Sequence, residues 1–241
     1  MLKNTKRTKI VCTLGPASEK EEVLTALIEN GLNVTRMNFS HGSHEEHKGR
    51  MDLVKKVREK LNKPVALLLD TKGPEIRTGN FDQPEVLLEE GQKFTITMKD
   101  VIGTKEICTV SYKGLANDVV AGDTILIDDG LVGLRVEEVN GDDILCIVEN
   151  SGIVKNHKGV NVPGVKINLP ALTDKDISDI EFGISQGIDF IAASFVRKVS
   201  DVLAIREVLE RNNATDIQII SKIENQEGVD NLDDIIAVSD G

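Results

Sequence analysis

Lys63–Arg77 reads KPVALLLDTKGPEIR and contains the strand around which the rest of the chain is arranged. Four apolar residues follow Val65 without interruption, and the run ends at Asp70. A run this short, with no polar alternation, is typical of a strand buried on both faces, as in a parallel sheet covered by helices. Asp70 then lies at the carboxyl end of the strand, where α/β folds place their functional residues. Ionisable groups at this position cost stability, so we predict a functional role for them.

The composition indicates a globular protein with an aliphatic core. The chain has 241 residues, of which 40% are apolar, 3% are aromatic and none is Trp. The formal net charge of −11 argues against a nucleic-acid surface, because neutralising phosphates requires clustered Lys and Arg. No stretch approaches the roughly 20 apolar residues that cross a bilayer. The three cysteines are far apart and suggest neither a disulfide framework nor a zinc site, so we predict a cytoplasmic protein without a membrane partner.

Strand and helix patterns alternate on both sides of this central strand. Before it, strands are expected at Lys9–Leu14 and Asn33–Phe39, and capping boxes at Ser18/Glu21 and Ser43/Glu46 should start the two helices. After Pro170, a capping box at Thr173/Asp176 and a cap at Ser200 should start two more helices. A short polar helix is expected at about 227–233. The remaining strands are expected at Asp189–Phe195, Ile217–Ile223 and Ile235–Val238.

The segment between the third and fourth strands has a different pattern. Phe94, Ile96 and Met98 alternate with threonines, which indicates a half-buried strand. Further short β-type runs are expected at Ile107–Val110, Thr124–Ile127, Leu131–Val136 and Ile144–Val148. Turn signals such as Asp129-Gly130 and Asn140-Gly141 separate them. We therefore predict a small all-β domain, built as a meander or antiparallel barrel.

Six strands in βα alternation, with a β insertion after the third, predict an α/β fold of the (β/α)8 TIM barrel type. About six of the eight βα units are present in the chain. The predicted domains are an incomplete barrel domain, 1–72 and 170–241, and a β-barrel lid domain, 73–169. A doubly wound sheet is the alternative, although no GxGxxG motif follows any strand.

In barrel geometry the strand ends gather several polar side chains at one mouth: Arg36, Asn38, Ser40, Asp70, Thr71, Lys222 and Glu224. Arg and Lys suit phosphate oxygens, whereas carboxylate, amide and hydroxyl oxygens suit Mg²⁺ or K⁺. Together they are the groups that phosphoryl transfer needs. Two simpler interpretations remain open, because Lys222 and Glu224 could form an ordinary ion pair and Arg36 could merely pair with Asp70.

His41, His44 and His47 suggest a second, transition-metal site. His44 and His47 are three residues apart at a helix start and could share a metal. The predicted Ser43/Glu46 capping box already explains the stretch, and no third ligand is evident. We therefore favour the structural interpretation.

Five motifs, in order along the chain, resemble the pyruvate kinase family in its bacterial type: TRMNFSHG (35–42), LDTKGPEIRTG (69–79), KGVNVPG (158–164), FIAASFVR (190–197) and SKIENQEGVDN (221–231). The resemblance covers essentially the whole chain. It implies glycolytic phosphoryl transfer from phosphoenolpyruvate to ADP, giving pyruvate and ATP. It also implies that Arg36 binds the substrate phosphate and that Lys222 stabilises the transferring phosphoryl group.

The same resemblance implies cofactors and further ligands. Glu224 is similar to one of two carboxylates that hold Mg²⁺ (or Mn²⁺), and the expected K⁺ ligands are Asn38, Ser40, Asp70 and Thr71. The expected nucleotide contacts are Asn38, His41, Arg77 and Lys158. The family's insertion closes over the mouth and would exclude water. The full-length protein is expected to be a homotetramer.

The chain departs from the family pattern at its end. The family's next motif, which supplies the second Mg²⁺ carboxylate, would lie just beyond Gly241. We therefore expect the 241-residue piece to be incompetent alone. The alternatives are a ligand-binding fragment without turnover, or another phosphoenolpyruvate/pyruvate barrel enzyme such as an aldolase or lyase. The KGVNVPG motif and Arg77 favour a nucleotide user over the last of these.

Overall fold

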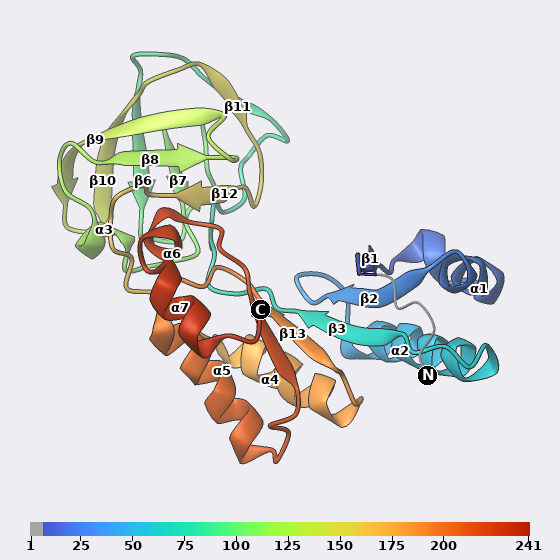
Figure 1. Ribbon diagram of the computed structural model, residues 1–241. Coiled ribbons are helices and arrows are strands. Elements are labelled where there is room, and N and C mark those ends of the chain that lie inside the picture. The colour runs from blue at the N-terminus through green and yellow to red at the C-terminus, as the bar shows by residue number, and fades with distance from the viewer. Residues whose placement is uncertain (1–6) are drawn as a thin grey trace. The chain divides into compact units, whose positions relative to one another are not determined.

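The computed structural model describes residues 7–241 and contains one parallel sheet with helices packed on it (Figure 1). The sheet has five strands in the order β1-β2-β3-β13-β14, and each neighbouring pair is parallel. Their bounds are β1 (Ile10–Thr13), β2 (Leu32–Asn38), β3 (Ala66–Asp70), β13 (Phe190–Ala193) and β14 (Gln218–Ser221). The connecting helices are α1 (Glu21–Glu29), α2 (His44–Lys60), α4 (Asp174–Ser185) and α5 (Val199–Arg211). The central strand of the sheet is the one predicted from Lys63–Arg77.

Two of the predicted helix starts are confirmed by their capping geometry. The Ser43 hydroxyl accepts from the Glu46 backbone N–H, and the Glu46 carboxylate accepts from the Ser43 N–H, which begins α2. Thr173 and Asp176 make the same reciprocal pair at the start of α4. Each box satisfies backbone donors that the first helical turn leaves unpaired.

The other two predicted caps are wrong. The Ser18 hydroxyl accepts from the Gly15 backbone N–H inside a 3₁₀ turn, η1 (Pro16–Ser18), so α1 starts later with Lys20 as its N-cap. Helix α5 starts one residue before Ser200, after an N-cap at Lys198. In both places the connecting turn, rather than the nearest hydroxyl, decides where the helix begins.

The predicted sixth strand, Ile235–Val238, is also wrong, because these residues belong to helix α7 (Leu232–Val238). A shorter helix, α6 (Gln226–Asp230), precedes it. The run Ile235-Ile236 reads as β-type, but only one of the two isoleucines is buried: the exposed fractions are 1% and 61%. Extended pairing begins just after α7, where the Asp240 N–H donates to the Ile219 carbonyl and the Ser221 N–H to the Gly241 carbonyl.

An aliphatic core joins the sheet to its helices. Met51, Val54 and Val57 of α2 are fully buried, as are Leu67 and Leu69 of β3. Both faces of β3 are covered, as its unbroken apolar run predicts. The strand therefore holds Asp70 rigidly at its carboxyl end.

The segment that follows β3 forms a separate, almost entirely β unit. Its larger sheet has the order β4-β12-β8-β9-β10-β6-β7, and its neighbouring pairs are antiparallel except for β6 and β7. The strands are β4 (Ile76–Arg77), β6 (Lys93–Thr97), β7 (Ile107–Thr109), β8 (Thr124–Ile127), β9 (Val132–Asn140), β10 (Asp143–Val148) and β12 (Gly159–Asn161). A second ladder pairs β5 (Val86–Leu88) with β11 (Gly152–Val154), and α3 (Leu115–Asp118) is a single helical turn.

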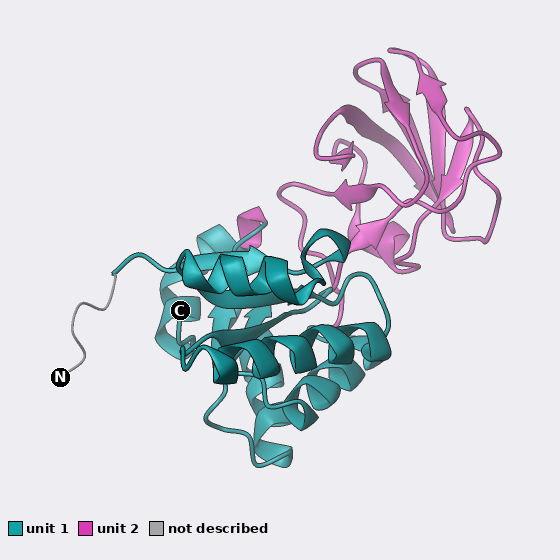
Figure 2. Ribbon diagram, turned by 90° about the vertical axis from the view of Figure 1, so that its right-hand side faces the viewer, with its two compact units in different colours: residues 1–73, 171–224, 228–241 teal, residues 74–170, 225–227 magenta. Residues whose placement is uncertain are grey.

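The described chain divides into two compact units (Figure 2). One comprises residues 7–73, 171–224 and 228–241, and the other comprises residues 74–170 with 225–227. Each unit has its own core of buried aliphatic residues. No helix in the described part of the chain is long and apolar enough to cross a membrane. We still propose that residues 1–72 and 170–241 act as a barrel domain and that residues 73–169 act as its lid domain. This division can be tested directly.

Replacing residues 73–169 with a short Gly-Ser linker in the full-length protein should leave the barrel folded and abolish nucleotide use. The reason is that each unit has a separate core, so removing one leaves the buried aliphatic residues of the other in the chain. We expect the melting temperature of the barrel to change by less than about 4 °C, the effect of roughly 1 kcal/mol in a domain of this size. Calorimetry and ADP titration measure the two outcomes. Loss of cooperative melting would show that the insertion is an integral part of the barrel.

Candidate active site

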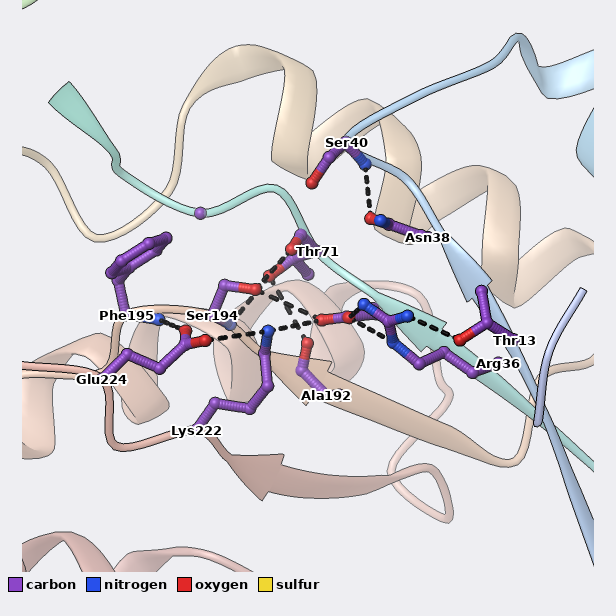
Figure 3. A network of polar contacts seen from close by, with 12 residues as sticks. Thr13, Arg36, Asn38, Ser40, Thr71, Ala192, Ser194, Phe195, Lys222 and Glu224 are labelled. Atoms are coloured by element: carbon purple, nitrogen blue, oxygen red, sulfur yellow. Dashed lines mark hydrogen bonds and ion pairs between the residues drawn. The ribbon is translucent and has the colours of Figure 1, made fainter. Parts of the chain in front are cut away.

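A polar network at the carboxyl edge of the parallel sheet includes Arg36, Ser194 and Lys222 (Figure 3), and Asp70 lies at its centre. Its carboxylate is 1% exposed and carries a cation on each oxygen. Arg36 Nε donates to Oδ2 at 2.6 Å, and Arg36 Nη2 pairs with the same oxygen. Lys222 Nζ lies 3.0 Å from Oδ1. These ion pairs offset the desolvation of the buried carboxylate.

Strand register brings these residues together. Asn38 of β2 and Ala192 of β13 both stand opposite Asp70, while Ala193 stands opposite Ser221 of β14. Since the strands are parallel, their carboxyl ends lie at one edge, and Lys222 follows β14 directly. Both ion pairs that the sequence left open are present in the structure. Arg36 pairs with Asp70, and Lys222 lies 3.4 Å from Glu224.

Glu224 is held by the turn that follows β13. The Phe195 backbone N–H donates to Glu224 Oε2 at 3.0 Å, and Oε1 faces Lys222. Phe195 has a φ of +56°, a conformation that bulky residues rarely adopt. The strained turn thus aims an N–H group at the carboxylate and fixes its orientation next to Lys222.

Asn38 and Ser40 lie where β2 ends, and Thr71 follows β3. Asn38 Oδ1 accepts from the Ser40 N–H at 3.1 Å, which folds the end of β2 over its own side chain (Figure 3). The Phe39 N–H donates to the Asp70 carbonyl, so this turn is tied to β3. The Thr71 N–H donates to the Ala192 carbonyl, which extends the pairing of β3 with β13.

Three residues of the network were missed in the sequence. Thr13 of β1 accepts from Arg36 Nη1 at 2.7 Å, Ser194 contacts Asp70 and Thr71, and Phe195 holds Glu224. Ser194 and Phe195 were missed because the predicted strand, Asp189–Phe195, included them. In the structure β13 ends at Ala193, and the two residues belong to the turn that follows it. The only sequence signal was that Ser194 is the one polar residue after Asp189 in that predicted strand.

The histidines serve packing and hydrogen bonding. His44 Nε2 lies 2.7 Å from Asp179 Oδ1, and His47 Nε2 lies 2.9 Å from the His41 carbonyl. The His47 ring stacks on Phe39 with 4.0 Å between ring centroids, and burial lowers the pKa of His47. Within residues 7–241 there is no group of three or more His, Cys, Asp or Glu side chains placed to hold a metal.

Arg77 and Lys158, the two expected nucleotide contacts of the β unit, lie close together along the chain pairing of β4 with β12. Arg77 of β4 stands opposite Gly159 of β12, and Lys158 immediately precedes β12, next to Thr78. Arg77 is bound by both oxygens of Glu75 at 2.6 and 2.7 Å, and this hydrogen-bonded pair raises the pKa of Arg77. Lys158 Nζ pairs with Asp128 at 3.0 Å. Each of the two cations is thus held by a carboxylate of its own.

A parallel βα sheet with cations and carboxylates at its carboxyl edge, interrupted after its third strand by a β unit, places the protein in the class of interrupted βα-barrel proteins. The family model described as pyruvate kinase, barrel domain, matches residues 5–241. The chain belongs to the pyruvate kinase family, and the TIM-like barrel prediction is confirmed at this level.

Individual relatives agree with the family match. The pyruvate kinase of Clostridium acetobutylicum is 60% identical over 236 residues, which are 98% of this chain and 50% of that protein. That of Bacillus licheniformis is 58% identical over 238 residues, 98% of this chain and 41% of the relative. That of Staphylococcus epidermidis is 57% identical over 238 residues, 98% of this chain and 40% of the relative. The chain thus spans half or less of the length of these relatives.

Proposed function

We propose that the protein containing this chain transfers the phosphoryl group of phosphoenolpyruvate to ADP. The bond from phosphorus to the enol oxygen breaks, a β-phosphate oxygen of ADP forms the new bond, and the enolate carbon takes up a proton to give pyruvate. The observation that carries the proposal is the convergence of Arg36, Lys222 and Glu224 around Asp70 at one sheet edge. The names of the relatives support this reaction over the aldolase or lyase alternative.

Arg36 binds the substrate phosphate in this proposal. Its fork is oriented by Asp70 and Thr13, and each terminal nitrogen has a second N–H that these bonds do not use. Because the guanidinium is already oriented, it loses little side-chain conformational entropy on binding phosphate, and this favours binding.

Lys222 stabilises the phosphoryl group during transfer. Its ammonium lies between two carboxylates, those of Asp70 and Glu224, which hold it at the sheet edge. A positive charge held in place before the reaction stabilises negative charge that develops on the phosphoryl oxygens, without reorganisation at that moment.

Two cations complete the proposal. Glu224 would hold Mg²⁺ (or Mn²⁺), while Asn38, Ser40, Asp70 and Thr71 would hold K⁺. The donor sets fit these ions, because all of them are oxygens, which Mg²⁺ and K⁺ prefer. When bound, the cations supply positive charge that screens the phosphate groups of the two substrates.

Nucleotide recognition is assigned to Asn38 and His41 at the end of β2, with Arg77 and Lys158 on the β unit. The proximity of Arg77 and Lys158 in the backbone, where β4 pairs with β12, supports a role for both in nucleotide recognition. We further propose a homotetrameric, cytoplasmic full-length protein that acts in glycolysis with no nucleic-acid or membrane partner. The net charge of −11 is consistent with that set of partners.

The test is pyruvate formation by the full-length protein from phosphoenolpyruvate and ADP. We expect turnover that requires ADP, stops when EDTA removes divalent metal and returns with Mg²⁺. Replacing K⁺ with Na⁺ should lower the rate. Pyruvate release without ADP would favour a lyase or hydrolase, and no pyruvate under any of these conditions would contradict the proposal.

A further inference from the structure

The Ser194 hydroxyl lies between two oxygen atoms of the predicted cation site. Its Oγ is 2.5 Å from the Thr71 carbonyl oxygen and 3.2 Å from Asp70 Oδ1. The residue is 7% exposed and follows β13 directly. Ser194 therefore touches Asp70 and Thr71, two of the residues expected to bind K⁺.

The Ser194 hydroxyl can donate to only one of its two neighbours. A serine hydroxyl has one proton, whereas an ionised carboxylate and a carbonyl are acceptors only. The 2.5 Å contact fits donation to the Thr71 carbonyl, while Asp70 Oδ1 has Lys222 Nζ as a donor at 3.0 Å. Ser194 thus ties the Thr71 carbonyl to the Asp70 carboxylate, and both present oxygen atoms of the kind that hard cations prefer.

Backbone hydrogen bonds fix the position of Ser194 relative to Thr71. The Ser194 N–H donates to Thr71 Oγ1 at 3.0 Å, and the Thr71 N–H donates to the Ala192 carbonyl at 3.0 Å. Gly73 passes so close that an added Cβ would lie 2.8 Å from Ser194 Cβ, and its φ is +71°. The Gly73 N–H donates to the buried Asp176 carboxylate at 3.1 Å. The 71–73 turn and Ser194 are thus fixed to each other from several sides.

We propose that Ser194 is a positioning residue that sets the affinity and selectivity of the monovalent-cation site. Ser194 contacts the Asp70 carboxylate and the Thr71 carbonyl, and it keeps these two groups at the spacing that K⁺ needs. This inference rests on the proposed function, because K⁺ is there the activating cation. Lys222 Nζ contacts the same oxygen, Asp70 Oδ1, at 3.0 Å.

The experiment compares Ser194→Ala with the wild type in K⁺ titrations of the full-length protein. We expect the half-activating K⁺ concentration to rise about tenfold, equivalent to about 1.4 kcal/mol. At saturating K⁺, kcat and the KM for phosphoenolpyruvate should return to wild-type values within about threefold. A purely structural role would lower activity in a way that added K⁺ does not restore. Discrimination between K⁺ and Na⁺ should also weaken.

Thr35→Val is the matched control. Thr35 is a fully buried residue of β2 whose hydroxyl donates to the Ala66 carbonyl at 2.9 Å, so the variant removes one buried hydrogen bond of the same sheet. Its half-activating K⁺ concentration should stay at the wild-type value. If Ser194→Ala does not fold, Ser194→Cys decides, because it nearly preserves volume but replaces the hydroxyl with a thiol, a weak hydrogen-bond donor, and the same K⁺ shift is expected.

Melting temperature in K⁺ and in Na⁺ separates this inference from the proposed function. A cation that binds only the folded state raises its stability, whether or not turnover occurs. A K⁺-specific rise in the wild type that Ser194→Ala loses would support the inference even if no pyruvate were formed. An unchanged K⁺ response of the variant, in activity and in melting, would overturn it while leaving phosphoryl transfer intact.

Discussion

Lys222→Met in the full-length protein is expected to lower kcat by at least about 100-fold while phosphoenolpyruvate binding changes little. One preorganised donor to a developing charge contributes about 3–4 kcal/mol to the transition state. Lys222 has the placement for this role, at 3.0 Å from Asp70 and 3.4 Å from Glu224. Steady-state kinetics give kcat, and direct titration of phosphoenolpyruvate gives binding.

The control for Lys222→Met is Lys56→Met, which removes an exposed lysine of α2 that pairs with Glu21 at 2.7 Å. Surface pairs of this kind contribute little, so its kinetics should match the wild type. Asp70 keeps Arg36 in the Lys222 variant, and cooperative melting should therefore persist. A fall in kcat of less than about tenfold would remove Lys222 from the transition-state role.

Residues 1–241 produced alone are expected to associate, to melt without a sharp transition and to form no pyruvate. The described sheet has β1 at one end and β14 at the other, and neither edge is closed by a further described strand. Ile10 and Val11 of β1 are 41% and 51% exposed, and Ile236 of α7 is also exposed. Open edges with apolar side chains pair with other chains, whereas barrel closure removes them.

There is a second reason to expect that residues 1–241 alone form no pyruvate. Glu224 is the one carboxylate assigned to Mg²⁺ in this piece, so we expect the metal to be held weakly there. Ultracentrifugation, calorimetry and the pyruvate assay test both parts, with the full-length protein as reference. Val11→Lys should reduce association, because a charge on an edge strand opposes pairing. A monomer that melts sharply would contradict the structural part, and turnover near that of the full-length protein would contradict the chemical part.

Local sequence patterns predicted those elements whose signal is complete within a few residues. The capping boxes at Ser43/Glu46 and Thr173/Asp176 succeeded because both partners lie within one helical turn. The β unit was recognised by its alternation, although the short strands β4, β5, β11 and β12 were missed. Two- and three-residue strands are too short to show a period and depend on partners elsewhere in the chain.

Predictions failed where a tertiary contact or a competing contact with a neighbouring residue overrode local preference. Ile235–Val238 has β-type residues, but helix α7 places Ile235 in the core and leaves Ile236 in solvent. Ser18 has the residue type of an N-cap, but its hydroxyl is taken by the Gly15 N–H. In both cases a tertiary or neighbouring contact outweighs a propensity worth a fraction of a kcal/mol.

The sequence by itself determined the order of the βα units, the position of the β unit and the residue types at the strand ends, because these depend on short-range periodicity. Tertiary structure decided which atoms meet. Ala192 stands opposite Asp70 across more than a hundred residues of intervening chain, and that register brings Ser194 to the carboxylate and Lys222 to its other side. No local pattern encodes the pairing of two distant strands, since register follows from how the whole sheet packs against its helices.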